Sequence, residues 1–219
     1  MGHGMSEGER YYVEKFEDYV NDLEYFTKKT IFVYKKQGMN PPVFLFGHSM
    51  GAAISTMLAY RNQSLYKGVY LSSPMFGIPQ FLENPISIFM GRLLSTFLPK
   101  LLLPVLFVNN NEISHDREVI EAYIKDPLIS NKQIFMRTAN ELQLAVMKIS
   151  EISKNISFPF HISAGEEDTI TPVRGSKIFY ENAKSKHKSL RIYKGSKHEI
   201  LHGKGSRIVR NDLYDWIVS

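Results

Sequence analysis

Hydrophobic and polar residues follow two different periods along this chain. From Phe16 to Lys36, large apolar side chains recur at helical intervals, and the Pro41-Pro42 pair ends the pattern soon afterwards. Four short apolar runs have instead the length and composition of buried strands: Val43–Phe46, Gly68–Ser73, Pro159–Ala164 and Leu190–Tyr193. Because helical segments separate consecutive runs, the pattern predicts an α/β fold built on a parallel sheet of these four strands.

The segments between the strands predict how the chain is organised. Ala52–Arg61 and Arg174–Lys186 are expected to be helices between strands, and Asp212–Val218 is expected to be part of a C-terminal helix. Residues 75–155 have an apolar, helical pattern with no clear strand. We therefore expect a core of residues 1–74 and 156–219. Residues 75–155 would form a helical cap inserted in that core, within a single structural domain.

The segment Pro85–Val108 is apolar and long enough to suggest a membrane span. Arg92 and Lys100 interrupt it, and Pro99 and Pro104 would break a helix, so a span is disfavoured. The pattern favours a packed cap, or a cap that also presents an apolar face to lipid or to an acyl chain. The residues expected to line an acyl channel are Ile86, Phe89, Leu93, Leu94, Phe97 and Leu101.

A serine between two glycines follows the first predicted strand, in the segment Gly47-His48-Ser49-Met50-Gly51. This arrangement is typical of a nucleophile elbow, a sharp turn from a strand into a helix. Glycines suit the flanking positions because the turn leaves little space for a Cβ and the helix packs close to the strand. The small residues that follow the motif strengthen this interpretation. His48 is expected to have a packing and hydrogen-bonding role.

A nucleophilic serine needs a base, and the base needs an orienting carboxylate, in the chain order Ser, Asp, His for this type of turn. Asp168 lies in the loop that follows the third predicted strand, and His198 lies in the loop that follows the fourth. Glu166 and Glu167 share the first of these loops, but Asp168 is the last acidic residue before Thr169 and the turn. We therefore predict that Ser49, Asp168 and His198 converge.

The segment from His198 to His202 also spells a zinc-binding pattern, His-Glu-x-x-His, in which two histidines on one helical face hold the metal. A catalytic zinc needs a third protein ligand, and Ile208 stands where a longer form of this motif has its third histidine. The segment also leaves a predicted strand through Gly195 rather than lying inside a helix. We therefore expect no metal site, and a polar role for His202.

Together these segments resemble the monoacylglycerol lipase and lysophospholipase branch of the α/β-hydrolases. The most specific pieces are Gly2-His3-Gly4, Ser6–Arg10, Gly47–Gly51, Ser73-Pro74, Asp126-Pro127-Leu128 and the loops that end at Asp168 and His198. The resemblance implies Ser49 as nucleophile, Asp168 as orienting acid and His198 as general base. It also implies hydrolysis of a carboxylic ester with a long acyl chain, such as a monoacylglycerol or a lysophospholipid. The Lys-, Ile- and Asn-rich composition is further similar to poxvirus-encoded copies.

The start of the chain departs from that family. Its members place three or four strands before this point, and a His-Gly element among them donates an N–H to the oxyanion. Here the chain begins directly before Gly2-His3-Gly4, as if from an internal methionine of a longer ancestor. We therefore expect a parallel-sheet α/β-hydrolase fold that lacks its first strands, with the Met50 N–H as oxyanion donor. The exposed edge of the first strand would favour self-association. The alternative is a catalytically silent remnant that binds lipid or a protein partner.

Composition narrows the function further. The net charge of +5 is modest and the basic residues form no stripe with aromatic residues, so no nucleic-acid partner is expected. The lack of cysteine excludes disulfides and thiol catalysis and is compatible with a reducing compartment. The polar segment Met1–Arg10 is no signal peptide, although Met1–Ser6 matches a myristoylation pattern. We expect a cytoplasmic serine esterase with a lipid ester substrate, no cofactor, and peripheral membrane contact through the cap.

Overall fold

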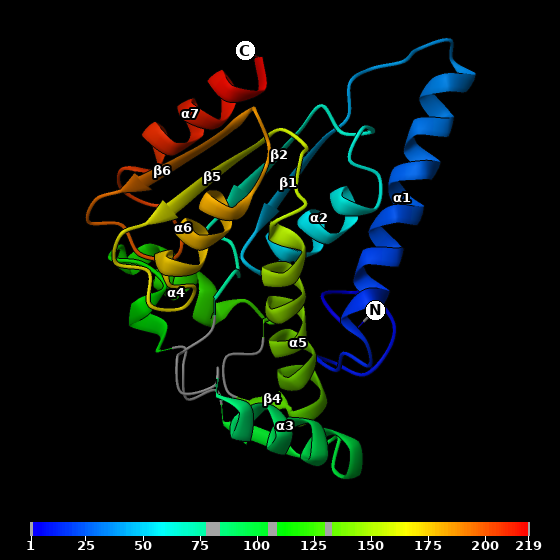
Figure 1. The fold of residues 1–219 in the computed structure, drawn as a ribbon. Coiled ribbons are helices and arrows are strands. Elements are labelled where there is room, and N and C mark those ends of the chain that lie inside the picture. Colours follow the sequence, from blue (N-terminus) through cyan, green and yellow to red (C-terminus); the bar gives the residue numbers. More distant parts are fainter. Residues whose placement is uncertain (1, 78–83, 105–108, 130–132, 219) are drawn as a thin grey trace.

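Four parallel strands form the central sheet of the protein (Figure 1). A computed structural model describes residues 2–77, 84–104, 109–129 and 133–218. The strands follow the order β1-β2-β5-β6, and their bounds are Phe44–His48, Gly68–Ser72, Phe160–Gly165 and Lys188–Tyr193. The predicted α/β fold class and the four predicted strands are thus confirmed. The first strand extends further than predicted, because Gly47 and His48 stay in register beside Leu71 and Ser72.

Helices cover the sheet on both faces. Helix α2 (Met50–Arg61) follows β1, α5 (Met136–Ser153) precedes β5 and α6 (Val173–Asn182) follows β5, and α1 (Phe16–Lys36) packs on α2. The C-terminal helix α7 (Ser206–Val218) lies on the opposite face, where Trp216 contacts the rings of Phe44, Tyr70 and His161 (Figure 1). Because both faces are covered, the two middle strands, β2 and β5, are buried at every residue.

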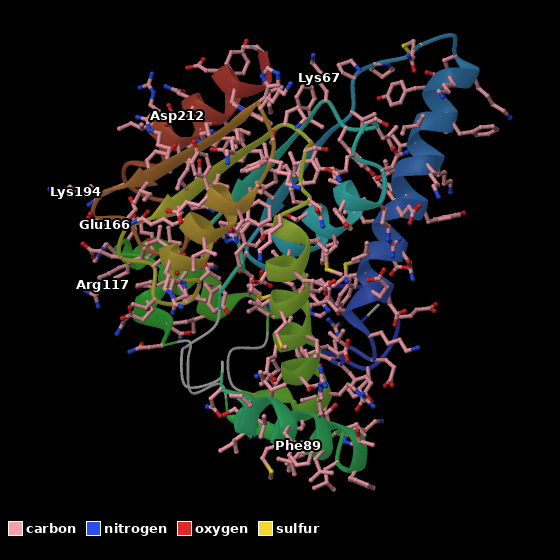
Figure 2. The ribbon with its side chains drawn as sticks, in the orientation of Figure 1. Lys67, Phe89, Arg117, Glu166, Lys194 and Asp212 are labelled. Atoms are coloured by element: carbon pink, nitrogen blue, oxygen red, sulfur yellow. The ribbon has the colours of Figure 1, made fainter. Side chains whose placement is uncertain are left out.

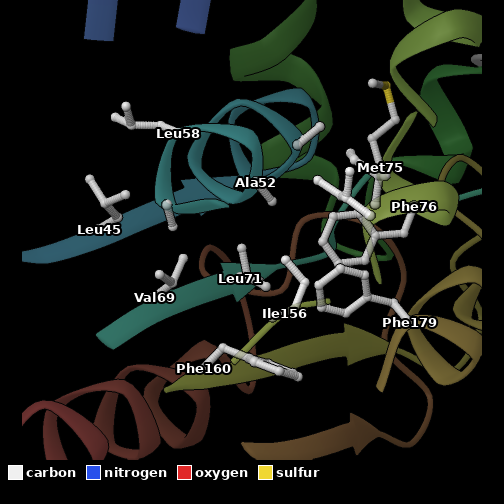
Figure 3. Packing of buried hydrophobic residues seen from close by; sticks show 14 of the residues in the cluster. Leu45, Ala52, Leu58, Val69, Leu71, Met75, Phe76, Ile156, Phe160 and Phe179 are labelled. Atoms are coloured by element: carbon white, nitrogen blue, oxygen red, sulfur yellow. The ribbon is translucent and has the colours of Figure 1, made fainter. Parts of the chain in front are cut away.

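The main core lies between α2 and the sheet, as Figure 3 shows. Alternate strand residues point into it, with Leu45, Val69 and Phe160 level with one another in the register. The rings of Phe76 and Phe179 lie 4.4 Å apart at its margin. Helix α5 contributes Ala145, Val146, Ile149 and Ile152 to the same cluster. The last helix of the segment predicted to be a cap therefore packs on the core, while a cap over Ser49 stays a prediction.

The rest of the segment 75–155 is less helical than predicted. It contains α3 (Pro85–Phe97), a 3-10 turn at Asn110–Glu112 and α4 (Arg117–Lys125). It also contains two short strands, β3 (Leu102–Pro104) and β4 (Gln133–Phe135), which pair antiparallel. The sequence showed no clear strand in this segment, because three-residue strands are too short to leave a periodic signal.

The apolar side chains of α3 do not line an enclosed channel among the described residues. Ile86, Phe89 and Phe97 are 75%, 64% and 74% exposed, and Leu93 and Leu101 are also exposed. Figure 2 shows Phe89 on the outer side of α3. Its small residues Gly91 and Ser95 are buried instead, on the side where α3 packs against α5. Leu94 is half-buried. Within the described ranges, no helix combines the length and the hydropathy needed to cross a membrane.

Candidate active site

Ser49 occupies a strained turn between β1 and α2. Its backbone has φ of 53° and ψ of −119°, a region that residues with a Cβ rarely enter. Such a conformation costs roughly 1–3 kcal/mol, which surrounding contacts must offset. The Ser49 N–H donates to the Ser72 carbonyl at 2.9 Å, and the Ser49 carbonyl accepts from the N–H groups of Ala52 and Met75, both at 3.1 Å. The predicted elbow is therefore present in the backbone.

The two glycines of the elbow differ in what they contribute. A Cβ at Gly47 would lie 2.4 Å from the Gly51 carbonyl oxygen and 2.6 Å from the Ala52 backbone, so close packing requires glycine there. A Cβ at Gly51 would meet nothing within 4 Å. The prediction that space is short at both flanking positions was correct for Gly47 and wrong for Gly51. Met50 begins α2, where N–H groups have no partner within the helix.

Asp168 and His198 form a hydrogen bond between the loops that follow β5 and β6. His198 Nδ1 lies 2.8 Å from Asp168 Oδ2. The Asp168 side chain is fully buried, and its Oδ1 accepts from the N–H groups of Ile170 at 3.0 Å and Thr171 at 2.8 Å. Because these donors face a buried carboxylate, they fix its orientation and that of the imidazole ring.

Two buried hydroxyl residues that sequence reasoning missed support this pair. The Thr171 hydroxyl donates to Asp168 Oδ2 at 2.8 Å and lies 3.1 Å from the Ser73 carbonyl oxygen. The Ser73 hydroxyl donates to the His198 carbonyl oxygen at 2.6 Å. The sequence did carry one signal for Thr171. An Asp followed three residues later by Thr is typical of a turn in which the carboxylate accepts backbone N–H bonds.

The structure brings the elbow and the His198 loop to the same end of the sheet. The rings of His48 and His198 have centroids 4.9 Å apart, and residues 73–75 bond to both parts through Ser73 and Met75. Among the described residues, no hydrogen bond joins the Ser49 hydroxyl to His198. Such bonds are often long in unliganded enzymes and shorten when substrate binds.

His48 contributes a neutral ring beside His198. Its Nδ1 lies 3.1 Å from the Ser72 hydroxyl, and its Nε2 lies 3.6 Å from Glu199 Oε2. Burial lowers the pKa of His48 to about 4, and the neighbouring Glu199 carboxylate opposes that shift only in part. At neutral pH His48 therefore adds no positive charge where His198 would have to become protonated.

The zinc-like segment does not adopt the geometry of a zinc site. Residues 198–202 are not helical, and His202 is exposed and paired with Glu199 at 2.9 Å. His198 is held by Asp168. In the part of the chain that the structure describes, no group of three or more His, Cys, Asp or Glu side chains is arranged to hold a metal ion.

Comparison with known proteins decides the family. A family model described as serine aminopeptidase, S33, matches residues 1–205. The chain belongs to this family. The chain has the fold of the solved monoacylglycerol lipase from Paleococcus ferrophilus. The two structures align with a TM-score of 0.81 and 25% identity. That alignment covers 99% of this chain and 80% of the other, and the described residues have the α/β-hydrolase fold.

Two curated relatives are similar to this chain over most of the chain's length. A monoglyceride lipase from Homo sapiens is 31% identical over 92% of this chain and 64% of its own length. A monoglyceride lipase homolog from Monkeypox virus is 29% identical over 99% of this chain and 76% of its own length. The resemblance to monoacylglycerol lipases, poxvirus copies included, is therefore confirmed.

Proposed function

We propose that this chain is a serine hydrolase that cleaves carboxylic esters with a long acyl chain, such as a monoacylglycerol or a lysophospholipid. The observation that carries the proposal is the 2.8 Å hydrogen bond between His198 Nδ1 and the buried Asp168 carboxylate, at the sheet end that also carries the Ser49 elbow. The names of the relatives, which are monoglyceride lipases, support the choice of substrate class.

In the proposed reaction the Ser49 hydroxyl attacks the ester carbonyl and its proton passes to His198 Nε2. Asp168 holds Nδ1 protonated and stabilises the imidazolium that forms. His198 then gives the proton to the departing alcohol. Water next attacks the acyl-enzyme with the same base, which releases the fatty acid and restores Ser49.

The oxyanion is proposed to bind at the start of α2. The Met50 N–H, first in the helix, lies directly after Ser49 and has no partner within the helix. The positive end of the helix dipole adds to its effect. Removing one such donor in a characterised hydrolase costs about 10²–10³ in turnover, which gives the size of the contribution expected from the Met50 N–H.

The exposed face of α3 is proposed to contact the lipid surface that holds the substrate. Ile86, Phe89 and Phe97 place three large apolar side chains together on one exposed face, whereas Gly91 and Ser95 face the protein. Interfacial helices bind membranes through apolar area of this kind. We propose peripheral membrane contact through this helix, and we assign the acyl-chain contacts to the same segment.

A catalytically silent chain that only binds lipid is the second candidate. It is favoured by the position of β1 at the edge of the sheet that the described residues form. Self-association through this edge belongs to the same proposal. The two candidates differ in whether Ser49 reacts.

Labelling with a fluorophosphonate probe separates them. We expect covalent labelling of the chain and none of Ser49→Ala, with turnover of dodecanoyl esters far above that of acetyl esters. The preference follows because each buried methylene contributes about 0.8 kcal/mol. A folded wild-type chain that stays unlabelled would support the silent candidate. Equal turnover of acetyl and dodecanoyl esters would contradict the long-chain assignment.

A further inference from the structure

The segment 111–116 contacts both loops of the candidate site, although it lies far from them in the sequence. We call residues 111–116 the clamp segment. Its central side chain is Glu112. Glu112 Oε2 accepts a hydrogen bond from the Thr169 hydroxyl at 2.8 Å, and Glu112 Oε1 lies 3.7 Å from Lys197 Nζ. Thr169 directly follows Asp168, and Lys197 directly precedes His198. One carboxylate therefore joins the neighbours of both members of the hydrogen-bonded pair.

Other atoms of the clamp segment hold the same two loops. The Asn111 carbonyl oxygen accepts from Lys197 Nζ at 2.6 Å, and the Ile113 carbonyl oxygen accepts from the Glu199 N–H at 2.8 Å. The residues on either side of His198 are thus both bonded to this segment. On the other loop, His115 Nε2 lies 2.8 Å from Glu167 Oε2. Figure 2 labels Glu166 and Arg117 in this region of the molecule.

The clamp segment is itself anchored to the protein. Ile113 is 4% exposed and Ser114 is 8% exposed, so the backbone between Glu112 and His115 is buried. Lys197 is mostly buried as well, with 15% of its side chain exposed, and Glu112 is 32% exposed. An ion pair that is this sheltered from water, with a hydrogen bond from Thr169 to the same carboxylate, is more than a solvated surface contact.

We propose that Glu112 is a positioning residue for the Asp168–His198 pair. It contacts neither ring nor carboxylate of the pair, and it acts by holding the two loops at a fixed separation. The distance between His198 Nδ1 and Asp168 Oδ2 depends on that separation, because the two residues lie on different loops. This inference rests on the proposed function for its effect on rate, since a displacement of about 1 Å in such a site can cost 10²-fold.

The test compares Glu112→Ala with Glu121→Ala by the rate of fluorophosphonate labelling. Glu121 is a suitable control because it lies on the neighbouring helix α4 and pairs with Lys125 on the surface. We expect Glu112→Ala to be labelled about 10-fold more slowly at saturating probe, with an unchanged half-saturation concentration. Glu112→Gln, which can still accept from Thr169, should recover part of the rate. Labelling of Glu112→Ala at the wild-type rate would overturn the proposal.

Hydrogen exchange gives a readout that needs no activity. Peptides that cover residues 166–172 and 195–204 should exchange faster in Glu112→Ala than in the wild type, and β2 and β5 should be unchanged. Unchanged exchange in either loop, or faster exchange throughout the sheet, would contradict a role in positioning. A wild-type chain that is not labelled at all would refute the proposed function, whereas the exchange experiment would still decide whether Glu112 holds the two loops.

Discussion

Gly165, the last residue of β5, and Lys197, in the loop that follows β6, approach so closely that a Cβ on Gly165 would lie 2.2 Å from the Lys197 carbonyl oxygen. The Ser196 carbonyl oxygen would lie 2.4 Å from the same Cβ. A contact of this length with backbone atoms can be relieved only by moving one of the two loops. The loops that carry Asp168 and His198 therefore abut through their backbones, and this contact limits how closely the two loops can approach each other.

Gly165→Ala should disturb both stability and probe labelling. The added methyl group has to displace the backbone of residues 196–197, and overpacking of this kind costs about 1–3 kcal/mol. We expect a lower free energy of unfolding and a labelling rate at least about 10-fold lower, measured by urea denaturation and by fluorophosphonate labelling. Gly51→Ala is the control for stability. It has open space and should gain roughly 0.5–1 kcal/mol from higher helix propensity. Wild-type stability in Gly165→Ala would contradict the contact.

Asp168→Asn should leave the fold intact and remove most of the activity. The amide can still accept from the Thr171 N–H, but it no longer holds the Nδ1 proton of His198 or stabilises the imidazolium. In a characterised serine hydrolase the same change costs about 10⁴ in turnover, and we expect a loss of that order in ester hydrolysis. Circular dichroism should show an unchanged fold. A loss below about 10-fold would show that Asp168 does not have the orienting role.

Stability should fall in mild acid because of a buried histidine on the α7 face of the sheet. His161 Nδ1 lies 2.7 Å from the Ser189 hydroxyl, and burial lowers the pKa of His161 to about 4. The unfolded chain takes up this proton at a higher pH than the folded chain. The contribution of neutral His161 to the free energy of unfolding is therefore fully present above about pH 6.5. It is lost as the pH falls toward about 4. The free energy of unfolding should fall by up to about 3 kcal/mol over this range of pH.

Urea denaturation of the wild type and of His161→Asn at several pH values between about 7 and 4.5 measures this effect. The variant should be less stable at neutral pH, and its free energy of unfolding should change less with pH. Curves that run parallel for the two proteins would show that His161 is not the group responsible.

Strong chelators should leave ester hydrolysis unchanged. The proposed chemistry uses Ser49 and His198 without a metal ion, and His202, the second histidine of the zinc-like motif, is exposed and bonded to Glu199. Turnover measured before and after prolonged dialysis against a chelator tests this. Stoichiometric zinc in the purified protein, with activity lost when it is removed and restored when it is returned, would overturn the serine mechanism.

Binding to lipid vesicles should depend on the outer face of α3. The double substitution Phe89→Ser and Phe97→Ser removes two large exposed apolar groups and should weaken sedimentation with phosphatidylcholine vesicles by at least about 10-fold. Labelling of Ser49 in solution by a fluorophosphonate with a short alkyl group should be unchanged, because such a probe does not use the acyl-chain contacts assigned to this segment. A matched control is Tyr25→Ser with Phe32→Ser on α1, which are similarly exposed. Equal loss of binding in both double variants would mean that α3 has no special role.

Several features could be predicted from the sequence because they depend on local pattern. The four strands are short runs rich in apolar residues, and the elbow at Ser49 needs only a strand, a glycine and a helix in succession. The chain order of Ser49, Asp168 and His198, each placed after a predicted strand, predicted that these three residues lie at the same end of the sheet. Errors occurred where local pattern has no bearing, as with β3 and β4 and the free space at Gly51.

The sequence by itself determined the fold class, the strands and the residue types at their ends, since these follow from hydrophobic period and chain order. Only the tertiary structure decided how the loops meet: the buried hydroxyl groups of Ser73 and Thr171, the backbone contact at Gly165, and the carboxylate of Glu112 between two loops. These contacts join residues distant in the chain, and a single sequence carries no record of which polar side chains will face each other. The outward turn of α3 has the same cause, because small residues at Gly91 and Ser95 allow close packing against α5 and leave the apolar face outside.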